Sequence, residues 1–112
     1  MHIAPIAVVE AFIDAWNAMD FTAIVDLLAD DVVYHNIPMT PLHGRDAVRD
    51  YLTSAGPFDS IHWQTLNIAA AGDVVLTERV DNFVKQGKRI SLPVMGVFEI
   101  RNGKITAWRD YF

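Results

Sequence analysis

The stretch LTERVDNF, residues 76–83, decides how the second half of this chain folds. Its β-branched and aromatic residues are typical of a strand, and side chains two positions apart on a strand point to the same side of the sheet. One face therefore carries Thr77, Arg79, Asp81 and Phe83, and the other carries Leu76, Glu78, Val80 and Asn82. Neither face is cleanly apolar, so this strand has to do more than cover a core.

The sequence around this stretch predicts a run of antiparallel strands. We expect strands at residues 61–70, 73–84, 88–99 and 104–111, separated by the turn-like segments AGD, KQGK and RNGK. The last segment contains Asn102-Gly103, the dipeptide that most favours a two-residue hairpin. The second half of the chain is therefore predicted to be β.

The first half is predicted to be mainly helical. Apolar residues recur every three or four positions over residues 5–19 and 21–29, and Asp20 can cap the second of these helices. A strand is expected at 32–37, a proline-containing loop at 38–44 and a third helix at 45–55. Helices followed by strands predict an α+β fold: a cone-shaped, curved, mixed but mainly antiparallel sheet with three helices on one face, enclosing an apolar pocket.

Length and composition limit the classes of function. The 112 residues are expected to form one domain, 1–112, and 52% of them are hydrophobic, a surplus that a homodimer interface and an apolar pocket would absorb. A net charge of −5 with scattered basic residues argues against nucleic acid. There is no cysteine, no long apolar run and no basic leader, so we expect a soluble, cytoplasmic protein that does not use a membrane. The histidines lie far apart, which argues against a metal site.

Polar and aromatic groups share faces on three of the predicted strands. Strand parity places Tyr34 beside Asn36, as it places Arg79 beside Asp81. On the last strand it groups Thr106, Trp108, Asp110 and Phe112. Such alternation is most often a solvated face with a weak surface ion pair, but it also fits the wall of an apolar cavity with a few polar anchors.

A family resemblance favours the cavity. The motif YHN at 34–36, LTERVDNF at 76–83 and LPVMGVFEIRNGKITAWRDYF at 92–112 resemble the limonene-1,2-epoxide hydrolase family in order and spacing. The similarity extends to EAFIDAWNAMDFTAIVDLLADDVVY at 10–34 and IPMTPLHGRDAVRDYL at 37–52. That family belongs to the nuclear transport factor 2-like, or SnoaL-like, superfamily of cone-shaped α+β folds.

The resemblance implies an enzyme that needs no cofactor and adds water to an epoxide. It implies a general acid at Asp81, a general base at Asp110, a bridging guanidinium at Arg79 and a water held by Tyr34 and Asn36. Concerted opening of an epoxide by water requires one protonated and one ionised carboxyl. We expect burial to keep Asp81 neutral and Arg79 to hold Asp110 ionised.

The predicted substrate is a small apolar or alicyclic epoxide of the terpene oxide type. On the strand around Gly96, a simple two-residue hairpin would select Met95 and Val97 for the pocket, whereas a bulge at Gly96 would select Leu92 and Val94 instead. The resemblance favours the second pair. The predicted lining is Phe83, Leu92, Val94, Trp108, Phe112, Met39, Phe58 and Ile61, each of which could equally be ordinary core.

Two other classes of function fit the same fold. A ketosteroid-isomerase-like or polyketide-cyclase-like enzyme would use one aspartate to move a proton beside a carbonyl group. A non-catalytic module would bind an apolar ligand or a second copy of the chain. Two aspartates within reach of one arginine favour water activation over the isomerase-like or cyclase-like chemistry, and the non-catalytic module stays an alternative.

Overall fold

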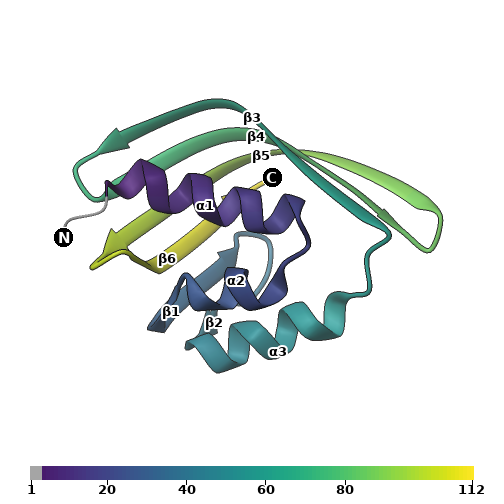
Figure 1. Cartoon of the computed structure of the whole chain (residues 1–112), viewed down its shortest axis with the longest axis horizontal. Helices are drawn as coiled ribbons and strands as arrows, with labels where there is room; N and C mark the ends of the chain where they lie inside the picture. Colours follow the sequence, from purple (N-terminus) through teal and green to yellow (C-terminus); the bar gives the residue numbers. More distant parts are fainter. Residues whose placement is uncertain (1–3) are drawn as a thin grey trace.

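The fold is a strongly curved six-stranded sheet with helices on its concave side (Figure 1). This computed structural model describes residues 4–112, so the first three residues of the predicted domain lie outside the described residues. The strand order is β2-β1-β6-β5-β4-β3. Strands β1 and β6 are parallel and all other neighbours are antiparallel. The predicted α+β architecture with a mixed, mainly antiparallel curved sheet is confirmed.

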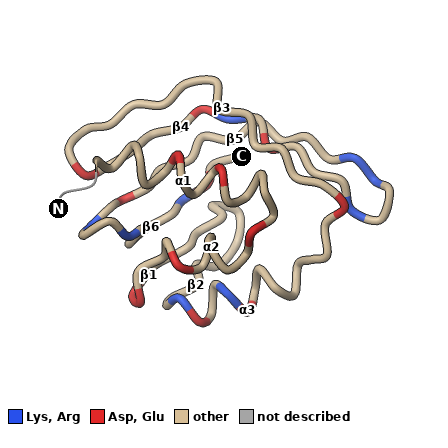
Figure 2. The backbone as a smooth tube through the Cα atoms, viewed as in Figure 1, with Lys and Arg blue, Asp and Glu red and all other residues tan. Residues whose placement is uncertain are grey.

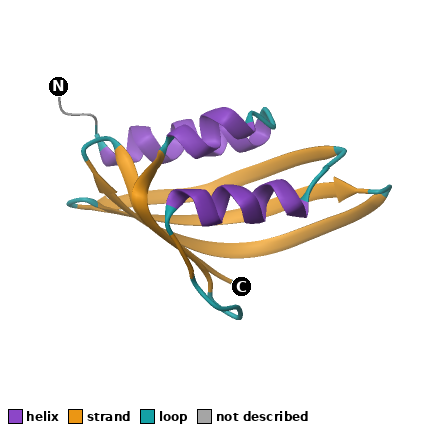
Figure 3. Ribbon diagram, turned by 90° about the horizontal axis from the view of Figure 1, so that it is seen from below, coloured by secondary structure: helices purple, strands orange, loops and turns teal. Residues whose placement is uncertain are grey.

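Figure 3 shows the helices lying against the sheet. Helices α1 and α3 bury apolar residues. Their bounds are α1 (Pro5–Asn17), α2 (Phe21–Asp26) and α3 (Arg45–Ala55). Helix α1 buries Phe12, Ile13 and Trp16, whose spacing places them on one face. Asp20 caps α2 by accepting a hydrogen bond from the backbone N–H of Ala23 at 3.1 Å. The start of α2 is therefore where the sequence predicts it.

The strands are β1 (Leu28–Asn36), β2 (Leu42–His43), β3 (Ser60–Ala71), β4 (Val74–Lys85), β5 (Lys88–Arg101) and β6 (Lys104–Tyr111). The four strands predicted for the second half are confirmed. Two predictions for the first half are wrong. The second helix ends at Asp26 rather than at 29, because Leu28 pairs with Ile105 of β6, and the predicted loop contains β2. Tertiary pairing overrides the weak helical pattern of these residues.

A bulge in the β5–β6 hairpin sets which residues face the concave side. Arg101 pairs with Lys104 and Ile100 with Ile105, but Glu99 pairs with Ala107, which leaves Thr106 without a partner on β5. The expected grouping of Thr106 with Trp108 is therefore broken, and the bulge lies here rather than at Gly96. Gly96 consequently faces Asp110.

The core lies between α1 and the concave face of the sheet. The ring of Phe12 makes edge contacts with Trp16, Trp63, Phe98 and Trp108 at centroid distances of 4.9–6.4 Å. Lys and Arg residues are spread over several elements (Figure 2). Within residues 4–112, no helix combines the length and the apolar character that a membrane span needs.

Candidate active site

One row of paired residues crosses the sheet and carries part of the site. Thr77 of β4 pairs with Gly96 of β5, Gly96 pairs with Asp110 of β6, and Asp110 pairs with Asn36 of β1. Side chains of paired residues project to the same face at short separation. The row therefore brings a carboxyl and an amide from distant parts of the sequence side by side.

Arg79, Asp81 and Asp110 form a buried cluster beside this row. The guanidinium of Arg79 donates from Nε to Oδ1 of Asp81 at 3.0 Å and from Nη2 to Oδ2 of Asp81 at 2.8 Å. The same Nη2 donates to Oδ1 of Asp110 at 3.2 Å. The three residues are 1%, 6% and 5% exposed, so the alternative of a solvated surface ion pair is wrong. One guanidinium links two carboxyls.

The guanidinium lies beneath the cavity rather than in its wall. Its carbon is 4.4 Å from the centre of a Trp63 ring and 5.9 Å from the ring of Phe98. Its Nη1 donates to the hydroxyl of Thr77 at 3.0 Å. Asp81 and Asp110 line the cavity, whereas Arg79 does not. Arg79 can therefore orient both carboxyls without touching a substrate.

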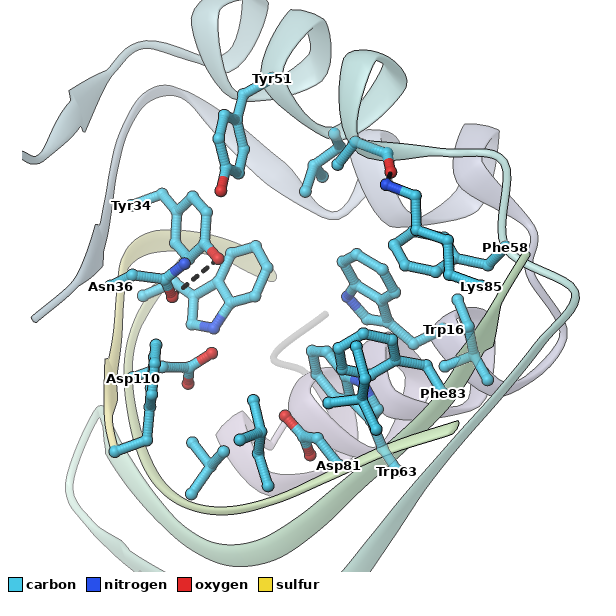
Figure 4. A pocket seen from close by; sticks show the side chains of 18 residues that line it. Trp16, Tyr34, Asn36, Tyr51, Phe58, Trp63, Asp81, Phe83, Lys85 and Asp110 are labelled. Carbon is cyan, nitrogen blue, oxygen red and sulfur yellow. Dashed lines mark hydrogen bonds between the residues drawn. The ribbon is translucent and has the colours of Figure 1, made fainter. Parts of the chain in front are cut away.

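A second polar pair stands beside Asp110. The hydroxyl of Tyr34 donates to Oδ1 of Asn36 at 2.8 Å, and the Tyr34 ring stacks on Trp108 at 3.9 Å (Figure 4). Burial, with the charge of Asp110, raises the pKa of the Tyr34 hydroxyl. Tyr34 therefore keeps its proton, and the amide nitrogen of Asn36 stays available to donate into the cavity.

Burial and charge act against each other in the cluster. Burial alone would lower the pKa of Arg79, but the two aspartates outweigh it and raise that pKa, so Arg79 stays charged. Burial raises the pKa of Asp110 and the charge of Asp81 adds to it, although Arg79 opposes both. Arg79 therefore lowers the pKa of Asp110 without cancelling the effect of burial. It gives two of its three carboxylate hydrogen bonds to Asp81 and one to Asp110.

The carboxyls open into an apolar cavity of about 370 Å³ (Figure 4). Helix α3 and the concave face of the sheet form its walls. The lining consists of Trp16, Tyr34, Asn36, Tyr51, Leu52, Ala55, Phe58, Ile61, Trp63, Asp81, Phe83, Lys85, Ile90, Leu92, Val94, Trp108, Asp110 and Phe112. A cavity of this size with a few convergent polar groups is typical of small-molecule sites. Within the described part of the chain, no three His, Asp or Glu side chains gather to hold a metal ion.

The sequence of the chain matches a known family over nearly its whole length. The family model for the limonene-1,2-epoxide hydrolase catalytic domain matches residues 3–112. The chain belongs to the limonene-1,2-epoxide hydrolase family.

Relatives of this hydrolase family agree with that assignment. The chain is 36% identical to epoxide hydrolase EphG of Mycobacterium tuberculosis over 104 residues, which cover 93% of this chain and 70% of EphG. It is also similar to the solved structure of an LEH-like epoxide hydrolase of M. tuberculosis, with a TM-score of 0.89, 36% identity and coverage of 96% and 81% of the two chains. A ketosteroid isomerase-like protein from Catenulispora acidiphila shares the fold at 23% identity, with a TM-score of 0.81 over 94% and 84% of the chains. This last match supports the fold alone.

The structure brings most of the predicted catalytic and substrate-binding residues to one cavity. Tyr34, Asn36, Asp81 and Asp110 line it together with Phe83, Leu92, Val94, Trp108, Phe112, Phe58 and Ile61. Met39 instead lines a smaller neighbouring hollow of about 220 Å³, which shares Tyr34 and Asn36 with the cavity. Met95 is 50% exposed and lines only a hollow on another part of the surface, so the choice of Leu92 and Val94 over Met95 matches the geometry.

Several lining residues were missed by the sequence analysis. Strand parity could have found Trp63 from Ile61, Lys85 from Phe83 and Ile90 from Leu92, because each pair is two residues apart. Trp16 lies on the apolar stripe of α1 and belongs to both the core and the cavity lining. The inner face of α3 contributes Tyr51, Leu52 and Ala55. No sequence signal singled these out from ordinary helix packing.

Proposed function

We propose that this protein hydrolyses a small apolar or alicyclic epoxide to a vicinal diol in one step, without a covalent intermediate. The observation that carries the proposal is the pair of buried carboxyls linked by Arg79 at the wall of an apolar cavity. Two carboxyls with one proton between them supply an acid and a base together. Epoxide hydrolysis needs both at the same moment.

Asp110 is the proposed base because the pair that can hold water stands beside it. A water that accepts a hydrogen bond from the amide of Asn36 can donate one proton to the Tyr34 oxygen and the other to Asp110. Asp81 is the proposed acid. It donates its proton to the epoxide oxygen as the C–O bond breaks, while the water oxygen bonds to carbon and gives its proton to Asp110.

The charges of the buried cluster favour one proton on the pair of aspartates. With one carboxyl ionised and the other protonated, the two aspartates and Arg79 sum to zero charge, whereas two ionised carboxyls leave a buried negative charge. The proposed active state therefore holds one proton on the pair. Its activity is expected to depend on pH as a bell-shaped curve.

A turnover moves one proton from Asp81 to Asp110. After the diol forms, Asp110 carries the proton and Asp81 is ionised, which suits the two hydrogen bonds that Arg79 gives Asp81. A proton must then pass from Asp110 to Asp81, through water in the cavity, before the next turnover. Water bound by Tyr34 and Asn36 assists this return by stabilising ionised Asp110.

The test is an assay of diol formation from limonene oxide, cyclohexene oxide and styrene oxide. Wild-type protein should form diols, and Asp81→Asn and Asp110→Asn should each lose about 10²–10⁴ in kcat while remaining folded by circular dichroism. An isomerase, a cyclase or a non-catalytic binding module would form no diol. Near wild-type turnover by either variant would contradict the assigned roles.

We also propose that a second copy of the chain covers the outer face of the sheet. Leu66, Leu76, Met95 and Tyr111 are exposed large apolar side chains on β3 to β6, and Met95 pairs with both Glu78 and Tyr111. Burying such side chains in a homodimer would remove them from water. Light scattering should give a dimeric mass for the wild type and a monomeric mass for Met95→Glu; an unchanged mass would exclude this face. The cytoplasmic location stays a prediction.

A further inference from the structure

Two residues without charge hold the guanidinium of Arg79 from behind. Thr77 is fully buried, although its side chain is polar. Its hydroxyl accepts a hydrogen bond from Nη1 of Arg79 at 3.0 Å and donates one to the carbonyl of Gly96 at 3.2 Å. A guanidinium can only donate, so the Thr77 proton must go to the Gly96 carbonyl. The hydroxyl therefore ties the arginine to the backbone of β5.

Gly96 provides the space into which the guanidinium packs. A Cβ at this position would collide with Nη1 of Arg79 and lie 2.8 Å from the Thr77 hydroxyl and 3.0 Å from Oδ1 of Asp110. The backbone of Gly96 is extended within β5, so its conformation does not demand glycine. Glycine is required here because the Arg79 guanidinium, the Thr77 hydroxyl and the Asp110 carboxyl all approach this position closely.

We propose that Thr77 and Gly96 are positioning residues that set the place of the Arg79 guanidinium and, through it, the relative orientation of Asp81 and Asp110. They act beyond the five residues of the proposed mechanism, and the inference about turnover rests on the proposed epoxide hydrolysis. Neither Thr77 nor Gly96 touches a substrate, because neither residue lines the cavity. Thr77 acts through Arg79, and Gly96 leaves the space that Arg79, Thr77 and Asp110 occupy.

The packing around Arg79 shows why such a support is needed. Nε and Nη2 are occupied by the two aspartates, and Trp63 faces the guanidinium carbon at 4.4 Å. Only the Nη1 side then remains to be fixed, and Thr77 provides the hydrogen bond there. Without that acceptor, Nη1 would be a buried donor lacking this partner, and the plane of the guanidinium could rotate away from Asp110.

The experiment compares Thr77→Val, Thr77→Ser and Gly96→Ala in the full chain. Valine keeps the shape of threonine but lacks the hydroxyl, whereas serine keeps the hydroxyl. Kinetics on an epoxide that the wild type hydrolyses should show kcat reduced about tenfold in Thr77→Val with KM nearly unchanged, and rescued to within about threefold in Thr77→Ser. Gly96→Ala should lower kcat on the order of 100-fold, because displacement of a positioned group by about 1 Å costs that much.

A second measurement does not depend on turnover. In protein labelled with ¹⁵N-arginine, the Arg79 Nη protons of the wild type and Thr77→Ser should give separate signals, assigned by their loss in Arg79→Lys. The two Nη1 proton signals should merge in Thr77→Val, because Nη1 then loses its acceptor, whereas Nη2 stays bound to both aspartates. If the wild type hydrolyses no epoxide, the proposed function fails, yet the signals still decide whether Thr77 holds Arg79. Unmerged signals in Thr77→Val, or equal loss of kcat in the valine and serine variants, would overturn the inference.

Discussion

Arg79 binds Asp81 through both carboxylate oxygens but binds Asp110 through only one. A two-point contact fixes the plane of the Asp81 carboxyl, whereas a single contact leaves the second oxygen of Asp110 free for another partner. That free oxygen belongs to the carboxyl beside Tyr34 and Asn36. The asymmetry gives the two aspartates different tasks, with Asp81 held in place and Asp110 available to water.

Arg79→Lys should separate charge from geometry at this contact. Lysine keeps the positive charge but cannot reach both aspartates with a planar fork of donors. We expect kcat for epoxide hydrolysis to fall on the order of 100-fold or more and the free energy of unfolding to fall by about 1–3 kcal/mol. Arg101→Lys, at an exposed pair with Asp31, is the matched control and should change neither quantity appreciably. Full activity in Arg79→Lys would show that charge alone suffices.

Tyr34→Phe tests the water-holding pair. The ring should stay stacked on Trp108, but the hydroxyl that bonds Asn36 is lost, so Asn36 and a bound water lose their anchor. We expect kcat to fall about 10- to 100-fold with thermal stability nearly unchanged. Tyr111→Phe, at a tyrosine of the proposed dimer face that does not line the cavity, serves as the control. Equal kcat values for Tyr34→Phe and Tyr111→Phe would show that the Tyr34 hydroxyl takes no part in the mechanism.

Asp110→Asn should stabilise the fold in a pH-dependent way. Burial raises the pKa of Asp110 above its ordinary 3.8. As the pH rises from that value, Asp110 loses its proton in the unfolded chain before it does so in the native state. The native state therefore loses stability until the pH passes the pKa of Asp110 in the folded protein. Asparagine has no proton to release in this range, so Asp110→Asn does not lose stability in this way. The difference in unfolding free energy between the variant and the wild type should therefore grow from pH 4 to pH 7 in urea titrations. Asp14→Asn, on the exposed side of α1, is the control. A difference that shrinks as pH rises would contradict the burial argument.

The sequence predicted the elements whose patterns are locally unambiguous. The third helix was predicted at the residues that α3 occupies, and the parity of residues 76–83 grouped Arg79 with Asp81 on one face, which the structure shows to be the buried one. Leu28 was misassigned because a short apolar segment fits a helix or a strand, and pairing with Ile105 decides between them. The bulge at Thr106 could not be located, because strand register depends on the partner strand.

The charged residues of the candidate site could be predicted from the sequence, but the residues that position them could not. Arg79, Asp81 and Asp110 stand out as polar residues on strand-like segments, and a family resemblance links them. Thr77 and Gly96 carry no such signal, since a threonine and a glycine on strands have ordinary structural explanations. Their importance depends on distances between three strands, which only the folded structure supplies.

The measurement that tests the central claim most directly is a single turnover in ¹⁸O-labelled water, with mass spectrometry of both diol and protein. If Asp110 activates water against the epoxide, the diol formed in this first turnover carries one ¹⁸O atom and the protein carries none. If an aspartate instead attacks the epoxide, the first diol is unlabelled and ¹⁸O appears in that aspartate, which would contradict direct hydrolysis.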